Sequence, residues 1–224
     1  MAALTATGLE KRYEDSLVLG PVHLAVAEGE RVALLGVNGS GKTTLLRLFT
    51  GVIEPSAGTV SVCGEPAGSL SARAALSFIS DTPVFYDDLS LAEHLEYIAG
   101  LHGVRAWRDR AEDLVERLGL SGRVDDLPNT FSRGLRQKAS LAIGLVRPHR
   151  VLLVDEPYVG LDAAGRTAFE QLIDEASAAG VTVVVATHQL ESVGQAVRCV
   201  VLGEGSIVHD GALEPDELTT LLDP

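Results

Sequence analysis

The stretch that decides the fold is Gly36-Val37-Asn38-Gly39-Ser40-Gly41-Lys42-Thr43-Thr44, which follows the apolar run Val32-Ala33-Leu34-Leu35. It fits the P-loop pattern G-x-x-x-x-G-K-[ST], with a predicted buried strand before it and a predicted helix, Thr43 to Phe49, after it. Its glycines let several backbone N–H groups point at one anion, and the helix N-terminus adds the positive end of its dipole. Lys42 is expected to contact the β- and γ-phosphates, and the Thr43 hydroxyl to ligate Mg²⁺. The stretch therefore predicts a nucleoside triphosphate site rather than a glycine-rich turn with a surface lysine.

Polar side chains follow two other predicted strands, at the point where each strand ends. Asp155 and Glu156 come after the apolar run Val151 to Val154, and His188 follows Val181 to Thr187. Ligands of parallel sheets bind at the carboxyl ends of the strands. An acid such as Asp155 holds Mg²⁺ in P-loop enzymes, and Glu156 can polarise the water that attacks the γ-phosphate. His188 is expected to contact the γ-phosphate and stabilise charge as the phosphoryl group leaves, although a lone histidine is usually structural.

The alternation of strands and helices predicts an α/β fold with a mostly parallel sheet. Fully apolar strands such as Val181 to Thr187 favour a sheet that is covered on both faces. Residues 1–31 are predicted to form short strands with turns, and residues 59–64 and 76–79 to form two further strands. The tail after Gly211 is predicted to be a short acidic helix at most.

Three predicted helices interrupt the α/β pattern. The first begins behind Ser90, a candidate N-cap with Glu93 three residues later. The second covers residues 109–118, and the third runs from near Ser132 to Val146. We expect a single domain, residues 1–224, whose core (1–85 and 150–224) carries an inserted helical lobe at about residues 86–149.

The composition excludes several classes of protein. Hydrophobic residues make up 46% of the 224 residues, but no apolar run is long enough to span a membrane, and residues 1–5 show no secretory signal. The formal net charge of −13 disfavours binding to nucleic acid or anionic lipid. The two cysteines, Cys63 and Cys199, are expected to be ordinary buried thiols in a reducing compartment. The expected location is therefore the cytoplasm.

Six motifs in a fixed order resemble the ATP-binding subunit of an ATP-binding-cassette (ABC) transporter. They are Tyr13, Gly36 to Thr43, Phe131 to Gln137, Leu152 to Glu156, Gly160 to Asp162, and Thr187-His188. The resemblance covers nearly the whole chain. It implies a P-loop NTPase cassette with a mostly parallel core sheet, a small antiparallel β-subdomain and an inserted helical lobe, and it implies ATP and Mg²⁺ as cofactors.

The resemblance also assigns residues outside the P-loop to the nucleotide. Tyr13 looks like the aromatic residue that stacks on adenine, with an ordinary edge-strand tyrosine as the alternative. Ser132 and Gly134 look like the signature motif, which opens a helix and contacts the nucleotide held by the other subunit. Two copies are then expected to close head-to-tail around two ATP molecules. Asp162 matches an acid that crosses this interface, and it is equally suited to be a helix N-cap.

Two positions depart from the family pattern. The signature, usually Leu-Ser-Gly-Gly-Gln, reads Phe131-Ser132-Arg133-Gly134-Leu135 here and looks like that of the exporter branch. Arg133 is expected to be either a solvated charge or a phosphate contact across the interface. Asp81 stands where the family has a glutamine that contacts Mg²⁺. Asp81 is therefore expected either to contact the metal or to cap the turn Asp81-Thr82-Pro83.

The sequence thus predicts an ATP-hydrolysing subunit that dimerises with itself or a paralogous cassette. It is expected to power transport, preferably export, through a separate integral membrane permease at the inner face of the cell membrane, with no nucleic acid partner. The groove near residues 81–97 is the expected docking surface. Two other readings are a soluble ABC ATPase that works on ribosomes or DNA, and a nucleotide-gated binding module that hydrolyses little ATP.

Overall fold

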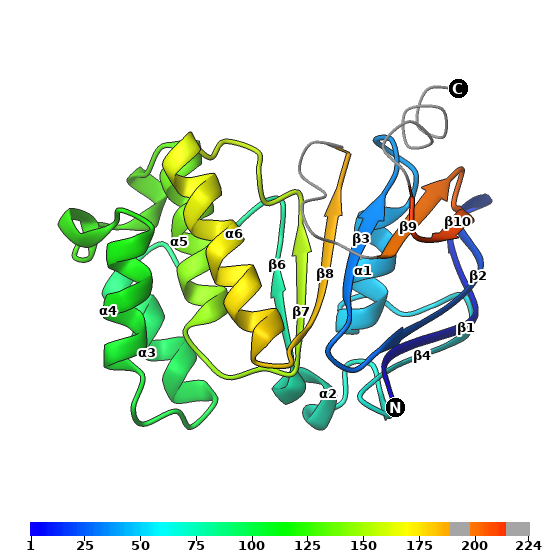
Figure 1. Cartoon of the computed structure of the whole chain (residues 1–224), viewed down its shortest axis with the longest axis horizontal. Helices are drawn as coiled ribbons and strands as arrows, with labels where there is room; N and C mark the ends of the chain where they lie inside the picture. Colours follow the sequence, from blue (N-terminus) through cyan, green and yellow to red (C-terminus); the bar gives the residue numbers. More distant parts are fainter. Residues whose placement is uncertain (189–197, 214–224) are drawn as a thin grey trace.

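The computed structural model describes residues 1–188 and 198–213, and a six-stranded sheet forms its centre (Figure 1). The strand order is β10-β9-β3-β8-β7-β6. Five of these strands are parallel, and only β10 is antiparallel to its neighbour β9. Their bounds are β3 Arg31–Leu35, β6 Leu76–Ile79, β7 Val151–Asp155, β8 Thr182–Thr187, β9 Arg198–Gly203 and β10 Ser206–Gly211. The mostly parallel sheet predicted from the sequence is confirmed.

A second sheet is antiparallel and has the order β2-β1-β4-β5. Its strands are β1 Ala2–Tyr13, β2 Ser16–Ala27, β4 Ala57–Val62 and β5 Glu65–Pro66. The prediction of short strands for residues 1–31 was wrong, because β1 and β2 form one long hairpin of two 12-residue strands. Four register shifts interrupt their pairing. Such bulges let a long hairpin bend without ending.

Helices and the antiparallel sheet cover the two faces of the central sheet. On one face, α1 (Lys42–Thr50), α2 (Leu70–Ala75) and the antiparallel sheet share a core that includes Phe49 and Leu153. On the other face, α5 (Arg133–Leu145) and α6 (Ala163–Ala178) share a core that includes Leu152 and Phe169. Neighbouring strand residues point to opposite faces, so β7 contributes to both cores.

The inserted helices continue the second core. α3 (Leu91–Leu101) and α4 (Arg108–Arg117) both contact α5. Leu95 of α3 and Leu114 of α4 are buried in the same cluster as Phe169 of α6. Figure 1 shows these helices gathered on one side of the central sheet. The boundaries of the helical lobe, about residues 86–149, remain a prediction.

Local capping signals set the helix boundaries. Ser90 and Glu93 form the predicted capping box at α3. The side chains of Ser132 and Asp162 accept hydrogen bonds from the first turns of α5 and α6. Each of these contacts satisfies an N–H group that the helix itself leaves without a partner. The strands β5, β9 and β10, the helix α2 and the two 3-10 helices Ser121–Arg123 and Pro128–Thr130 were not predicted. The predicted acidic helix of the tail falls on residues 214–224, outside the described residues.

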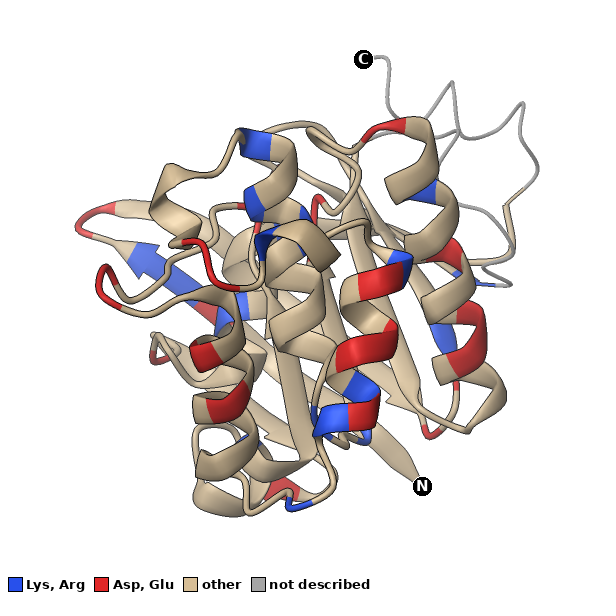
Figure 2. Cartoon of the chain, turned by 90° about the vertical axis from the view of Figure 1, so that its left-hand side faces the viewer, with Lys and Arg blue, Asp and Glu red and all other residues tan. Residues whose placement is uncertain are grey.

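The surface of the lobe mixes charges of both signs. Figure 2 shows Lys and Arg beside Asp and Glu on the same helices of this side. One example is the double hydrogen bond that joins Arg117 of α4 to Glu175 of α6 at 2.8 Å. Among the residues described, none of the helices combines the length and the apolar character needed to cross a bilayer.

Candidate functional site

The P-loop lies at the carboxyl end of β3 and is held by residues far from it in sequence. A Cβ atom at Gly36 would lie 2.5 Å from the carbonyl oxygen of Leu202, so only glycine fits. Gly205, in the β9–β10 turn, donates from its N–H to the Ser40 carbonyl at 3.2 Å. A Cβ atom at Gly205 would lie 2.6 Å from the carbonyl oxygen of Val18 in β2. The loop is thus packed between β2 and the β9–β10 turn.

Lys42 is the buried cation of this loop. Its Nζ donates to the carbonyl oxygens of Gly36 at 2.7 Å and Val37 at 3.2 Å. It also lies 3.7 Å from Oε1 of Glu156. Burial lowers the pKa of Lys42, and the negative charges of Glu156 and Asp155 oppose that effect. An ammonium group held by weak carbonyl acceptors is ready to exchange them for phosphate oxygens.

Glu156 follows β7 directly and has a left-handed backbone with a φ of 46°. A non-glycine residue in this conformation costs about 1–2 kcal/mol, and such strain gathers at functional sites. The N–H of Glu156 donates to the Ala186 carbonyl of β8 at 2.8 Å, which fixes the turn. The conformation places the carboxylate beside the P-loop.

His188 and Thr187 contact this carboxylate from the end of β8. Nδ1 of His188 lies 2.9 Å from Oε1 of Glu156, and the Thr187 hydroxyl donates to Oε2 at 3.3 Å. The imidazole is 40% exposed, so it can still reach a ligand from its other nitrogen. The structure therefore joins His188 to Glu156, whereas the sequence predicted only a phosphate contact.

Asp155 is fully buried beneath the same loop. Neither of its carboxylate oxygens has a hydrogen-bond partner among the described residues. Burial raises the pKa of Asp155 to about 6; the charges of Asp81 and Glu156 add to the rise, and the nearby Thr43 hydroxyl and Lys42 oppose it. A buried acceptor without a donor needs an explanation, and a bound cation supplies one.

Lys42 and Glu156 line one cavity of about 220 Å³. Its lining residues are Val18, Asn38, Gly39, Gly41, Lys42, Thr43, Thr44, Asp81 and Glu156. The cavity thus combines the N-terminus of α1 with hydroxyl, carboxylate and ammonium groups. Such a set suits a phosphate chain together with a hard cation.

The side chains at this cavity can hold Mg²⁺ only together with waters and the phosphates of a bound nucleotide. The described part of the chain has no group of three or more His, Cys, Asp or Glu side chains placed to hold a metal alone. Mg²⁺ usually takes one or two carboxylates, several waters and the phosphates of a substrate. Thr43 and the unpartnered Asp155 meet that need.

Seven predicted nucleotide contacts do not line this cavity: Tyr13, Ser132, Gly134, His188, and Gly36, Val37 and Ser40 of the P-loop. Tyr13 ends β1, is 47% exposed and has the Lys11 ammonium 5.0 Å from its ring centre. Ser132 caps α5, and a Cβ atom at Gly134 would lie 2.5 Å from the Gly160 carbonyl oxygen. Within one chain, Ser132 and Gly134 therefore lie at the start of α5 and not at the P-loop cavity.

Asp162 forms two contacts within its own chain. Its Oδ1 accepts from the Gly165 N–H at 2.8 Å and lies 2.9 Å from Nζ of Lys138. The N-cap role predicted for Asp162 is confirmed, and its role across an interface stays a prediction. The Asp81 carboxylate accepts from the Ser80 hydroxyl at 3.0 Å, and the Thr82 N–H donates to that hydroxyl at 3.3 Å, so both roles expected of Asp81 stay predictions.

Sequence reasoning missed Val18 and Gly205, which both touch the phosphate loop. Val18 looks like any β-strand residue. Gly205 follows the apolar run Cys199 to Leu202, which could have signalled a strand and turn. Their contact with the loop depends on sheet pairing that no local pattern contains.

Comparison with known proteins agrees with this geometry. The sequence profile of the ABC transporter family matches residues 19–159. The aliphatic sulfonates import ATP-binding protein SsuB 1 of Mesorhizobium japonicum is 36% identical over 93% of this chain and 78% of its own. The Nod factor export ATP-binding protein I of Burkholderia orbicola is 34% identical over 95% of this chain and 71% of its own. A solved ATP binding subunit of an ABC transporter superposes with a TM-score of 0.91 at 29% identity, covering 97% of this chain and 98% of that one. The chain therefore belongs to the ABC transporter family, as one of its ATP-binding proteins, which are ATPases coupled to transport.

Proposed function

We propose that this chain binds ATP with Mg²⁺ at the P-loop cavity, hydrolyses it, and closes head-to-tail with a second cassette to drive a separate membrane permease. One observation carries the proposal. Lys42 and Glu156 line one cavity, His188 contacts Glu156 from the end of the neighbouring strand β8, and the buried carboxylate of Asp155, next to Glu156 in the chain, has no hydrogen-bond partner among the described residues. Each role below follows from that arrangement.

The residues divide the chemistry between them. Lys42 gives up its loop carbonyls to contact the β- and γ-phosphates. Glu156 polarises the attacking water, and His188 orients the Glu156 carboxylate through the 2.9 Å contact and offers its other nitrogen to the γ-phosphate. Thr43 and Asp155 would hold Mg²⁺, with Asp81 as a further oxygen donor at the cavity wall. Bound there, Mg²⁺ would neutralise charge on the phosphates.

The second cassette completes the site. Ser132 and Gly134 lie at the N-terminus of α5, which is 13 residues long and is capped by Ser132 itself. A helix start of this kind binds phosphate, but it lies outside the P-loop cavity of its own chain. In a dimer with a two-fold axis, the signature of each chain would lie over the P-loop of the other chain. Tyr13 would stack on adenine at the open side.

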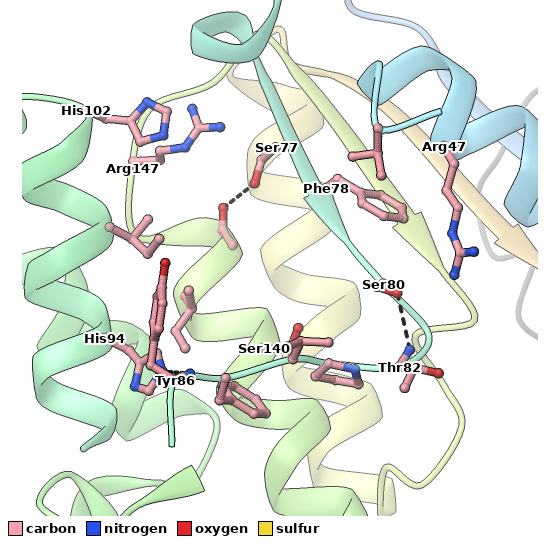
Figure 3. A pocket seen from close by; sticks show the side chains of 17 residues that line it. Arg47, Ser77, Phe78, Ser80, Thr82, Tyr86, His94, His102, Ser140 and Arg147 are labelled. Atoms are coloured by element: carbon pink, nitrogen blue, oxygen red, sulfur yellow. Dashed lines mark hydrogen bonds between the residues drawn. The ribbon is translucent and has the colours of Figure 1, made fainter. Parts of the chain in front are cut away.

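The permease docks in a groove of about 620 Å³ between the core and the helical lobe (Figure 3). Val84 is 90% exposed and Tyr86 53% exposed at its rim. His94 fixes this rim, because its Nε2 accepts from the Tyr86 N–H at 2.9 Å and its Nδ1 contacts the Ser90 carbonyl at 2.8 Å. The lining includes two arginines, two histidines and no carboxylate. A mostly apolar segment with an acidic side chain would fit.

The direction of transport is proposed to be export, on the signature Phe131 to Leu135. The names of the relatives include both an import and an export protein, so they favour neither direction. The chain would lie at the inner face of the cell membrane because it is bound to its permease there.

The test is whether the tagged chain stays with the membrane fraction after cell lysis and washing. Val84→Glu should release it while leaving ATP affinity unchanged, since Val84 touches the groove and not the P-loop cavity. Val208→Glu on β10 is the matched control, because Val208 is also an exposed valine, at 53%. Equal membrane retention of all three proteins would contradict docking in this groove.

A further inference from the structure

Tyr158 is a buried side chain in the loop that leads from β7 to α6, two residues beyond Glu156. Its ring packs edge-on against Phe169 of α6, with the ring centres 5.4 Å apart and the ring planes at 80°. Its hydroxyl donates a hydrogen bond to Oε1 of Glu170, the next residue of α6. The loop is therefore attached to α6 through both the ring and the hydroxyl of Tyr158.

The carboxylate that accepts from Tyr158 is itself held by a charge. Oε2 of Glu170 accepts from Arg31 at 3.0 Å, and Arg31, the first residue of β3, also donates to Asp174 of α6 at 2.5 Å. Burial raises the pKa of Tyr158, and the hydrogen bond to Glu170 raises it further, so the hydroxyl keeps its proton and stays a donor. Hydrogen bonds to an ionised carboxylate are stronger than those between neutral groups. Through Glu170, Tyr158 is thus connected to both α6 and β3.

The backbone of Glu156 needs support from such an attachment. Its φ of 46° is left-handed, and the next residue is Pro157, before which an extended backbone is favoured. A strained conformation persists only where the surrounding structure fixes it. On one side the Glu156 N–H donates to the Ala186 carbonyl at 2.8 Å. On the other side Pro157 has no N–H to donate, and the Val159 N–H reaches the Glu156 carbonyl only at 3.4 Å. The buried side chain of Tyr158 is placed to fix this second side.

We propose that Tyr158 is a positioning residue for ATP hydrolysis. Through its hydrogen bond to Glu170 it holds the strained backbone of Glu156, and so keeps the Glu156 carboxylate beside the P-loop. Tyr158 does not line the P-loop cavity, so it acts through Glu156 and not on the nucleotide. This inference rests on the proposed role of Glu156 as the base that polarises the attacking water.

Loss of the hydroxyl would displace this carboxylate. The Glu156 backbone would relax toward the extended form that is favoured before proline. Its carboxylate lies 2.9 Å from Nδ1 of His188 and 3.7 Å from Nζ of Lys42, and both contacts depend on that backbone. A displacement of about 1 Å in an active site can cost about 100-fold in rate. Because His188 and Thr187 still hold the carboxylate from β8, we expect a partial displacement and a loss of about tenfold.

The experiment measures kcat, KM for ATP and melting temperature of Tyr158→Phe, which keeps the ring contact with Phe169 and removes only the hydroxyl. The kcat should fall about tenfold, while KM stays within about twofold because the P-loop is unchanged. Glu170→Ala, which removes the acceptor, should show the same pattern, and Glu170→Gln, which keeps an oxygen acceptor, should retain most of the turnover. In the Glu156→Gln background, with enzyme in excess over ATP, Tyr158→Phe should change the residual rate by less than about twofold, because no base is left to position.

The matched control is Asp174→Asn, which weakens the other ion pair of Arg31 and leaves the bond between Tyr158 and Glu170 in place. Its kcat should equal that of the wild type. A lower melting temperature with unchanged kcat in both Tyr158→Phe and Glu170→Ala would overturn the proposal and leave the network a purely structural one. An equal loss of rate with and without the Glu156 carboxylate would overturn it as well, because Tyr158 would then act on another group. Wild-type turnover in Glu156→Gln would instead refute the proposed base, and the positioning role would fall with it.

Discussion

Replacement of Glu156 by glutamine removes the proposed base and changes little else. Glutamine has nearly the same shape and can keep contacts with His188 and Thr187, which now lie 2.9 and 3.3 Å from the carboxylate. Loss of a general base costs about 100- to 10,000-fold in rate. This corresponds to about 3–5 kcal/mol of barrier. Steady ATP turnover should fall by this factor.

The ATP affinity of Glu156→Gln, unlike its turnover, should not fall. Oε1 of Glu156 lies 3.7 Å from Nζ of Lys42, so the carboxylate now competes with phosphate for this ammonium group. A carboxylate about 4 Å from a phosphate repels it by about 1 kcal/mol in a water-filled cavity. Glu156→Gln should therefore bind ATP with equal or up to about fivefold higher affinity. With hydrolysis blocked, the ATP-bound dimer should accumulate.

The assay combines phosphate release, calorimetric ATP affinity and size-exclusion chromatography with ATP. Glu65→Gln is the matched control, because Glu65 lies exposed in β5 and has no contact with the cavity. It should behave like the wild type in all three measurements. Turnover of Glu156→Gln within a factor of about three of the wild type would refute the base assignment.

Three further predictions follow from the same contacts. Lys42→Ala should weaken ATP binding as well as turnover, because the ammonium contacts phosphate in both ground and transition states; unchanged affinity by calorimetry would remove the loop from the site. Ser132→Arg should keep ATP in its own P-loop and lose the ATP-dependent dimer, seen by size-exclusion chromatography; a dimer of wild-type strength would contradict the signature role. Gly134→Ala should destabilise the chain by about 1–3 kcal/mol in denaturant unfolding, since its Cβ would lie 2.5 Å from the Gly160 oxygen, whereas Gly100→Ala, with open space around it, should not.

Local patterns predicted most of the fold. The P-loop, β6 and the caps at Ser90 and Asp162 were predicted because each depends on a few consecutive residues. The β9–β10 hairpin was missed, since β9 pairs with β3 across more than half of the chain and no nearby signal records that pairing. The long β1–β2 hairpin was divided into short strands because bulges break its alternation. Distance along the sequence, more than residue type, limited the prediction.

The site shows the same limit. Lys42 was predicted from the P-loop pattern, and Asp155, Glu156 and His188 were predicted from their places at strand ends. The contact of His188 with Glu156 and the clamp by Gly205 depend on side-chain and turn geometry that the sequence does not contain. The hydrogen bond of Tyr158 to Glu170 likewise appears only when α6 is placed against the loop that follows β7.

We propose that each active site combines the P-loop of one chain with the signature of another. Lys42→Ala has a damaged P-loop and an intact signature, and Ser132→Arg has the reverse. A head-to-tail pair of the two variants contains one fully intact site and one doubly damaged site.

The decisive measurement is ATP turnover of an equal mixture of these two variants. Each alone should be nearly inactive, and the mixture should recover roughly a quarter of wild-type turnover if the two sites act independently. Turnover of the mixture equal to the mean of the two separate activities would contradict the shared site.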